Sequence, residues 1–397
     1  MVALILGASI GVGHAQEKQT ARPEIGQPVE QAAQLLKQKK YKEALAKLTA
    51  ADLAPDKTAY ERYVIEGTRA AVDQASGDYP GAIKALEAAL ATGILAPPDA
   101  LLRIEALVQL NYQVKDYAQV VAEANRYYQQ GGTADGPRLL QVQAYYLNND
   151  FANAARAIRM ILDADQKAGK KPAENLLLTL LNSEYRQANE AGRIDALERL
   201  AALYPKKQYW SDLLTAIAKK PGFASRLTLD LDRLKAATGA MGATSDYMDA
   251  AQLALLAGLP GEAKSLLDKG YAAGILGTDA QADREKRLAD MAAQQAADAA
   301  KALGQKESEA DAASNGAALE KVAEGYASFG QYDKAVAVYS RALQKGGMQN
   351  PDDAKLHLGI AYLAAGQRAK ARETLGGVAG NDGTRDLAQV WLILAKA

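Results

Sequence analysis

Small and large apolar residues recur at helical spacing on both sides of short glycine-containing breaks near the carboxyl end of the chain. The first copy spans residues 319–342 with a break at 329–332, and the second spans 358–375 with a break at 366–367. Small residues such as Ala323 and Gly359 let two antiparallel helices approach closely, and larger residues such as Tyr326 fill the space beside them. One helix pair cannot bury its apolar face alone, so such units must stack. The pattern therefore predicts an array of helix pairs.

Weaker copies of this break recur along the whole chain. Breaks fall near residues 39, 77, 115, 149, 191, 258, 330 and 366, and the intervals 191–258 and 258–330 have double length. Each long interval predicts one degenerate unit. The first has a turn at Pro221-Gly222, and the second has a charged, alanine-rich helix over residues 283–303 with a turn near Gly304. We therefore expect an all-α fold, an α-solenoid with a right-handed superhelix of about ten helix pairs and a terminal helix over residues 385–396.

The motif EGYASFGQYDKAVAVYSRAL at residues 324–343 resembles the tetratricopeptide repeat family. It matches the order of a small residue, Tyr, Gly-x-Tyr, Ala, an aromatic residue and Ala within a unit of about 34 residues. The resemblance is clearest over residues 317–379, present over 31–162 and weakest between them. It implies a protein that binds other proteins in a concave groove lined by the first helix of each pair.

The resemblance also implies a set of groove residues in the third, fourth and fifth units. The residue after the buried Tyr position points into the groove, and this register selects Tyr112 and Tyr146. One turn earlier lie two Gln residues, with Tyr185 at the matching earlier position in the fifth unit. Tyr offers flat contact area with a hydroxyl, and Gln pairs with backbone amides, which suits an extended peptide. The alternative is that these side chains pack between neighbouring units. The predicted partner-binding residues are Gln109, Tyr112, Gln113, Gln143, Tyr146 and Tyr185.

Side chains that carry catalysis or hold metal ions are scarce. The chain has no Cys, which excludes disulfides, thiolate metal sites and cysteine nucleophiles, and it has two His. His14 lies in a predicted leader segment. We expect His357 to be a packed helix residue, because no Ser, Asp or Glu constellation is placed around it in the sequence. The sequence therefore predicts no catalytic residue, no metal ligand, no cofactor and a chain that is not an enzyme.

Positive and negative charges balance over the chain. Lys plus Arg and Asp plus Glu both number 47, so there is no electrostatic reason to expect nucleic-acid binding. Basic residues dominate only residues 206–235, where seven Lys and Arg face three Asp. We expect this stretch to be a solvated helix face.

An apolar run over residues 1–13 is typical of the hydrophobic region of a signal peptide. Gly13 and Ala15 place small residues at the positions that favour cleavage after Ala15, and charged, Pro-containing sequence follows. We expect a periplasmic or secreted protein whose true start lies upstream, since a positively charged first region is missing; the alternative is a buried amino-terminal helix. No later segment is long and apolar enough to predict an integral membrane span. The predicted organisation is a signal peptide over 1–15, truncated at its start, a linker over 16–30, an array over 31–238, and a second array with the terminal helix over 245–397.

The terminal helix over residues 385–396 predicts a further contact. Leu387, Val390, Trp391 and Leu394 form one apolar stripe, and residues 392–393 add apolar surface beyond it. We expect a homodimer or the partner to cover this surface; the alternative is that the solenoid curls enough to bury both faces.

These expectations combine into one function. We expect a scaffold or adaptor in the bacterial cell envelope that binds a peptide or protein segment in the concave groove of the solenoid. Two alternatives stay open: a structural solenoid that self-associates, and a non-catalytic regulatory arm of an envelope enzyme complex. The identity of the protein or peptide partner does not follow from the sequence.

Overall fold

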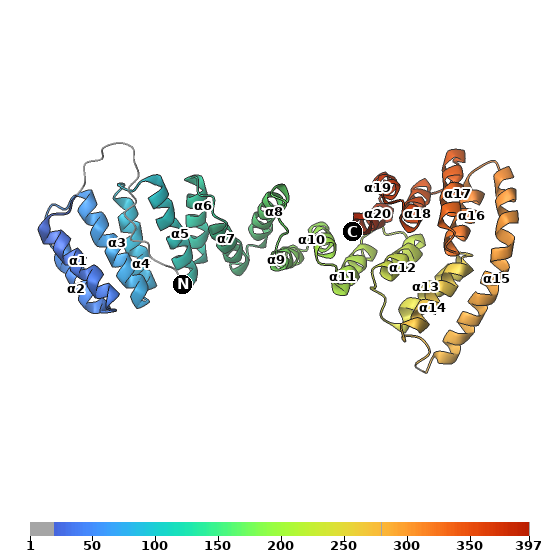
Figure 1. Ribbon diagram of the computed structural model, residues 1–397, viewed down its shortest axis with the longest axis horizontal. Helices are drawn as coiled ribbons and strands as arrows, with labels where there is room; N and C mark the ends of the chain where they lie inside the picture. The colour runs from blue at the N-terminus through green and yellow to red at the C-terminus, as the bar shows by residue number, and fades with distance from the viewer. Residues whose placement is uncertain (1–19, 279, 397) are drawn as a thin grey trace. The chain divides into compact units, whose positions relative to one another are not determined.

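The computed structural model describes residues 20–278 and 280–396, and within these residues it contains helices and no strands (Figure 1). The predicted signal peptide over residues 1–15 lies outside the described residues. The helices form two compact units, Met1–Lys170 and Lys171–Ala397. The predicted all-α solenoid of helix pairs is confirmed, and each unit is described by itself.

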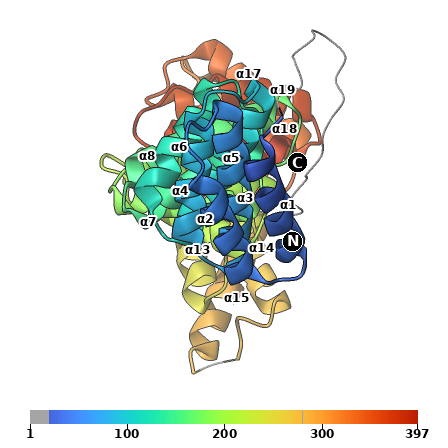
Figure 2. The same ribbon diagram turned by 90° about the vertical axis from the view of Figure 1, so that its left-hand side faces the viewer.

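The first unit is a stack of helix pairs, which lie side by side in Figure 1 and are seen from the end of the stack in Figure 2. Its first helices contact each other in neighbouring pairs, α1 with α3 and α5 with α7. The pairs in the described part are α1 (Pro23–Lys37) with α2 (Tyr41–Asp52), α3 (Ala59–Ser76) with α4 (Tyr79–Ala91), α5 (Pro97–Gln113) with α6 (Tyr117–Gln129), and α7 (Asp135–Leu147) with α8 (Phe151–Lys167).

The first helix begins inside the segment predicted as a linker. Pro23 stands at the first helical position, where its fixed φ favours a helix and its missing N–H is not needed. Ile25 is fully buried between α2 and α3. The Arg22 side chain donates to Glu61 Oε1 over 2.8 Å, and this hydrogen bond, against the opposing effect of burial, lowers the pKa of Glu61 to about 2. Tertiary contacts therefore order residues that the local composition assigned to a linker.

The second unit contains helix pairs and two further helices, α15 and α20, that are not part of a pair. Its elements are α9 (Glu174–Arg186), α10 (Glu190–Leu203), α11 (Lys207–Ala218), the short 3₁₀ helix η1 (Ser225–Leu227), α12 (Thr228–Ala237), α13 (Thr244–Leu256), α14 (Pro260–Ala272), α15 (Ala282–Ala312), α16 (Ala317–Ser328), α17 (Tyr332–Lys345), α18 (Pro351–Ala364), α19 (Arg368–Gly376) and α20 (Thr384–Lys396). The predicted division at residues 239–244 falls in the connection between α12 and α13, and the two predicted arrays stay a prediction.

The turns inside eight of the nine described helix pairs share one backbone feature, and the α11–α12 connection, which contains η1, lacks it. A residue with positive φ stands directly before the N-cap of the second helix, and this conformation is easy for Gly and costs about 1–2 kcal/mol for other residues. Before α4, α6, α8 and α10, an Asp or Asn cap such as Asp116 then accepts a hydrogen bond from the first turn. These positions confirm the predicted breaks, except that the break predicted near residue 191 lies at Ala188. The positive-φ residues are Lys39, Gly77, Lys115, Asn149, Ala188, Gly258, Gly330 and Gly366.

The long helix α15 corrects one prediction. We expected a turn near Gly304, but α15 runs unbroken for 31 residues through that position. Its buried side chains, among them Leu288, Ala292 and Leu303, lie against α14 and α16. A Cβ at Gly304 would meet open space, so this Gly serves no turn or close approach. The described residues therefore hold nine helix pairs and two single helices instead of about ten pairs.

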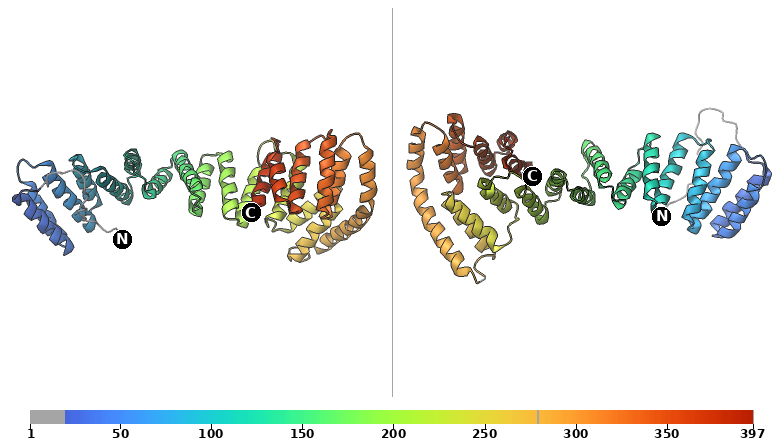
Figure 3. Two further views of the ribbon diagram at one scale, coloured as in Figure 1. Left: turned by 45° about the horizontal axis from the view of Figure 1, so that its top comes forward. Right: turned by 180° about the vertical axis from the view of Figure 1, so that it is seen from behind.

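The terminal helix α20 returns to the beginning of the second unit (Figure 3). It contacts α18 and α19 and also α10 and α12. Leu387 and Val390 are fully buried, Trp391 is 7% exposed, and residues 392–394 are half-buried. The unit therefore curls back on itself and covers much of the apolar surface that predicted a homodimer. Self-association through α20 stays a prediction, with less exposed surface to support it.

None of the described helices is both apolar enough and long enough to cross a membrane, and the longest, α15, is rich in charged residues.

Candidate functional site

Three of the predicted groove residues lie exposed on two adjacent helices of the first unit. Gln109 and Gln113 are exposed on α5, and Gln143 is exposed on α7. The two helices contact each other, and a Cβ at Gly136 of α7 would lie 3.7 Å from Glu105 Oε1 of α5. The exposed faces of α5 and α7 therefore meet without an intervening helix.

Exposed leucines extend this surface, and the sequence analysis missed them. Leu102 is 58% exposed and lies seven residues before Gln109, on the same face of α5. Leu139 and Leu147, 44% and 47% exposed, flank Gln143 at a spacing of four residues. We name this surface the α5/α7 strip. It consists of Leu102, Gln109, Gln113, Leu139, Gln143 and Leu147. Only the structure identifies these leucines, because an apolar residue at helical spacing ordinarily indicates core.

Tyr112 and Tyr146 lie at the edge of this strip and are half-buried. The Tyr112 ring lies 5.9 Å from the Tyr117 ring, and the Tyr146 ring lies 5.4 Å from the Phe151 ring in an edge-on arrangement. Each Tyr thus packs across the turn of its own helix pair, which such aromatic pairs stabilise. One side of each ring is thus used inside its own helix pair, and a contact of these rings with a partner stays a prediction.

Tyr185 occupies a different position from the one that the sequence predicted. Tyr112, Tyr146 and Tyr185 all stand four residues before the N-cap of the next helix, so Tyr185 matches the two other tyrosines and not the Gln position one turn earlier. Its helix pair has Glu190 where the others have an aromatic residue, and the ring is 66% exposed. Tyr185 belongs to α9 in the second unit and is not part of the α5/α7 strip.

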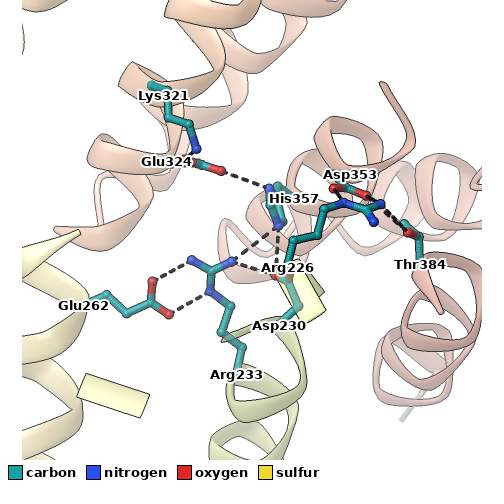
Figure 4. A network of polar contacts seen from close by, with 9 residues as sticks. All are labelled: Arg226, Asp230, Arg233, Glu262, Lys321, Glu324, Asp353, His357 and Thr384. Atoms are coloured by element: carbon teal, nitrogen blue, oxygen red, sulfur yellow. Dashed lines mark hydrogen bonds and ion pairs between the residues drawn. The ribbon is translucent and has the colours of Figure 1, made fainter. Parts of the chain in front are cut away.

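The second unit contains a buried polar network around His357, which Figure 4 shows. His357 Nε2 lies 2.8 Å from Asp230 Oδ1, and Arg233 donates to the same oxygen over 2.6 Å. Arg233 also donates to both carboxylate oxygens of Glu262, over 2.7 and 2.6 Å. The network joins α12, α14 and α18. His357 is a packed helix residue, as expected, and its carboxylate partner could not be found beside it in the sequence because Asp230 is 127 residues away.

A second group of contacts pairs the basic stretch with residues near the carboxyl end. Arg226 donates to Asp353 over 2.7 and 2.9 Å and to Asp382 over 2.6 Å. Lys220 lies 2.7 Å from Asp386 of α20. These cations therefore neutralise distant carboxylates where the unit closes, and the prediction of a solvated basic face is wrong for them. The residues 206–235 carry excess positive charge because their acidic partners lie elsewhere in the chain.

Burial and neighbouring charges shift several pKa values in this region. Burial lowers the pKa of His357, but the attraction and hydrogen bond of Asp230 outweigh it and raise that pKa above its ordinary value. Burial alone would raise the pKa of Asp230, whereas His357 and Arg233 hold it below its usual range. Glu198 of α10 behaves differently: burial, with the charges of Asp195 and Asp386, raises its pKa to about 7. Asp230 and His357 thus favour each other's charged form, whereas the pKa of Glu198 lies near neutrality.

A pocket of about 310 Å³ opens beside this network. Its polar lining comes from five helices and includes Arg233, Glu262, Lys269, Glu324, Tyr332 and His357. Trp391 of α20 lines the same pocket, and its buried Nε1 has no hydrogen-bond partner among the described residues. A buried donor without a partner costs about 1–3 kcal/mol, so Trp391 is an energetically unfavourable group at the edge of this pocket.

A protein-family model described as tetratricopeptide repeat matches residues 326–397. This segment contains most of the motif at residues 324–343, and the predicted resemblance is confirmed. No curated protein matches the sequence significantly.

Solved structures of tetratricopeptide repeat proteins are similar to this chain at low identity. A tetratricopeptide repeat protein from Parabacteroides merdae ATCC 43184 is 10% identical over 83% of this chain and 98% of that chain, with a TM-score of 0.31. The TPR2AB domain of yeast Sti1, in a pHSP90 complex, is 13% identical over 75% of this chain and 98% of that chain, with a TM-score of 0.24. A chain of the Naa15/Naa10 structure bound to HypK-THB is 16% identical, with a TM-score of 0.32, and the match covers 91% of this chain and 58% of that chain. These likenesses do not identify a partner of this chain.

Proposed function

We propose that this chain, which ends in tetratricopeptide repeats, is a non-catalytic scaffold of the bacterial cell envelope that holds an extended segment of another protein on the α5/α7 strip. The observation that carries the proposal is the combination of exposed Leu and exposed Gln side chains on adjacent first helices of the first unit. Stacked helix pairs serve as extended binding surfaces in repeat proteins, which supports a protein partner.

The composition of the strip supports an extended segment as the ligand. Leu102 and Leu139 are about half exposed, and they supply apolar contact area to side chains of a partner. Gln109 and Gln143 carry both a donor and an acceptor, so each can pair with a backbone N–H and C=O of an extended chain. The strip has little formal charge, and its recognition would therefore depend on apolar and amide contacts more than on ionic strength.

A peptide array tests this site directly. Short overlapping peptides from exported envelope proteins of the same organism are probed with the purified chain, and bound peptides are titrated in solution by fluorescence anisotropy. We expect the double variant Leu102→Ser/Leu139→Ser, and separately Gln109→Ala/Gln143→Ala, to weaken binding by at least about tenfold, which corresponds to ~1.4 kcal/mol.

The matched control changes two exposed Gln residues on α6 of the same unit, Gln119→Ala/Gln129→Ala. This control should bind as the unchanged chain does, and circular dichroism should give the same helix content for all variants. Equal binding by the strip variants and the control would place the ligand elsewhere and overturn the α5/α7 assignment.

The cellular location is tested separately. Amino-terminal sequencing of protein recovered from the periplasm, from a gene that includes the upstream start, should begin at Gln16. Intact protein in the cytosol would contradict the proposed envelope location. The proposed binding by the α5/α7 strip would then still be tested by the peptide titration.

A further inference from the structure

We propose that Glu320, Glu324 and His357 form a binding site for a divalent transition-metal ion in the second unit. Glu320 and Glu324 stand four residues apart on α16 and therefore share one face of that helix. His357 comes from α18, which contacts α16. One ligand atom of each side chain lies within 4.8 Å of those of the other two.

The separation of two of the ligand atoms fits a bound metal. His357 Nδ1 lies 3.5 Å from Glu324 Oε1. Zinc binds imidazole nitrogen and carboxylate oxygen at about 2.0–2.2 Å, which places two tetrahedral ligands roughly 3.3–3.6 Å apart. Glu320 is the more accessible ligand, being half-buried where Glu324 is buried. Its carboxylate oxygen lies within 4.8 Å of the ligand atoms of the other two residues.

The hydrogen bonds of the histidine leave the required nitrogen available. Asp230 Oδ1, a carboxylate oxygen that can only accept, lies 2.8 Å from His357 Nε2, so Nε2 carries a proton and donates it. His357 Nδ1 is buried, has no hydrogen-bond partner among the described residues, and faces Glu324. A ring nitrogen that donates to a carboxylate while the other nitrogen is free is the arrangement in which carboxylates orient metal-binding histidines. Arg233 in turn holds Asp230, which fixes the ring.

The donor set selects the class of ion. One imidazole nitrogen favours zinc and other first-row transition metals, and two carboxylates add hard oxygen donors. Three protein ligands leave at least one coordination position open, as in sites that also bind water or a partner group. Glu324 and His357 both line the 310 Å³ pocket, so the proposed site borders that space. Lys321 contacts the other oxygen of Glu324 over 2.8 Å and leaves Oε1 to the metal.

The alternative is that these three residues form a structural ion network without a metal, because His357 already pairs with Asp230. The two arrangements differ at one atom. In a structural network Nδ1 carries a proton toward Glu324, and in a metal site Nδ1 binds the ion. An experiment that observes the His357 ring therefore separates them.

The full chain, purified without a histidine tag and stripped with a chelator, is titrated with Zn²⁺ by equilibrium dialysis and with Co²⁺ by absorption spectroscopy. The chain has two histidines, so His14→Ala leaves His357 as the single ring in a ¹⁵N-histidine NMR spectrum. We expect one bound Zn²⁺ per chain and a metal-dependent shift of the Nδ1 signal. Glu320→Gln and Glu324→Gln should each weaken binding at least ~10–100-fold, the cost of losing even an outer-shell partner.

The control is Asp333→Asn, which removes an exposed carboxylate on the neighbouring helix α17 and should leave the affinity unchanged. If Glu324→Gln fails to fold, Glu320→Gln carries the test, because Glu320 is half-buried and its only change is one atom of the side chain. Zinc binding that both variants retain, or a His357 ring signal that does not respond to metal, would overturn the proposed site. This result is independent of the peptide titration on the first unit.

Discussion

The two units are built from the same kind of helix pair, but in the described part of the chain only the second unit has a last helix that returns to contact its first helices. In the first unit, each pair contacts its neighbours along the stack, α1 with α3 and α5 with α7. In the second unit, α20 returns to contact α10 and α12, so residues from the two ends of the unit share one interior. The ion pairs follow this difference. Arg69 pairs with Asp52 only 17 residues away, whereas Arg226 pairs with Asp353 at 127 residues and Lys220 with Asp386 at 166.

One kind of helix pair thus produces two kinds of surface. A stack in which each pair contacts only its neighbours leaves the first-helix face open, and in the first unit that face carries exposed Leu and Gln. A unit that closes must bring charged side chains from distant helices into its interior, where they need partners. Stability in the first unit should therefore be close to a sum of neighbour contacts, and stability in the second should depend on the closing contact.

Removal of α20 should break the second unit and spare the first. Leu387, Val390 and Trp391 are buried against other helices, and each buried side chain of this kind contributes about 1.5–3 kcal/mol. A chain that ends at residue 383 should lose at least ~5 kcal/mol in the second unit. Urea unfolding followed by circular dichroism should then show an early transition for the second unit and an unchanged later one for the first.

Removal of α1 and α2 is the matched truncation at the other end. This pair contacts α3 but closes no ring, so the remaining stack should keep a cooperative transition. If both truncations destabilise the chain equally, the second unit is not held by its closure.

Arg226→Ala should have the next largest effect. The substitution leaves Asp353, whose side chain is 13% exposed, without its cation, and an unpaired buried charge costs about 3–5 kcal/mol. Arg226 is itself partly exposed, so we expect the lower end, about 3 kcal/mol, in urea unfolding. Arg69→Ala in the first unit breaks a pair with the exposed Asp52 and a pair with the half-buried Glu66, and neither carboxylate is left fully buried, so it should cost about 1 kcal/mol or less. An equal loss from both would contradict the comparison.

Glu198→Gln should stabilise the second unit, and only at higher pH. Burial raises the pKa of Glu198 from 4.5 to about 7 in the folded chain. Below pH 4.5 both states hold the proton and there is no penalty. Between pH 4.5 and 7 the unfolded chain loses the proton first, so stability falls as pH rises, and above pH 7 the full penalty remains.

The rise in pKa sets an upper bound of about 3 kcal/mol on the gain in the free energy of unfolding. Hydration of this partly exposed side chain lowers the expected gain to about 2 kcal/mol at pH 8. Thermal unfolding of the variant and the unchanged chain at pH 4.5 and pH 8 measures it. A gain that is the same at both pH values would show that Glu198 carries no raised pKa.

Local spacing predicted the helix pairs but not what happens between distant ones. The breaks at 77, 115, 149, 258, 330 and 366 could be found because Gly, Asp or Asn at a turn is a local signal. The unbroken helix through Gly304 could not, because a single Gly costs a helix only about 1 kcal/mol relative to Ala and neighbouring alanines offset it. The ion pairs of Arg226 and Lys220 that close the second unit appeared in the sequence only as an excess of positive charge, and nothing nearby in the sequence identified their acidic partners.

The candidate sites show the same limit. Helix periodicity and the family register placed Gln109, Gln113 and Gln143 on exposed faces, but the exposed leucines beside them resemble core residues in the sequence. His357 looked isolated because its carboxylate neighbours come from α12 and α16. A single sequence contains no signal for a contact that depends on the curvature of the whole unit.

The smallest predicted effect compares equivalent tyrosines in the two units. Tyr112 and Tyr185 both stand four residues before an N-cap, but Tyr112 packs on Tyr117 whereas the following helix of Tyr185 begins with Glu190. Tyr112→Ala should cost about 1–2 kcal/mol, since it removes a half-buried ring and an aromatic pair. Tyr185→Ala should change stability by less than ~0.5 kcal/mol, as expected for a surface substitution. Urea unfolding of both variants measures the difference. If Tyr185→Ala is as destabilising as Tyr112→Ala, the Tyr185 ring is structural, and the aromatic residue after the N-cap does not decide the role of this position. If Tyr185→Ala costs much less stability than Tyr112→Ala, the Tyr185 ring has no stacking partner in its own turn and is available to contact another protein.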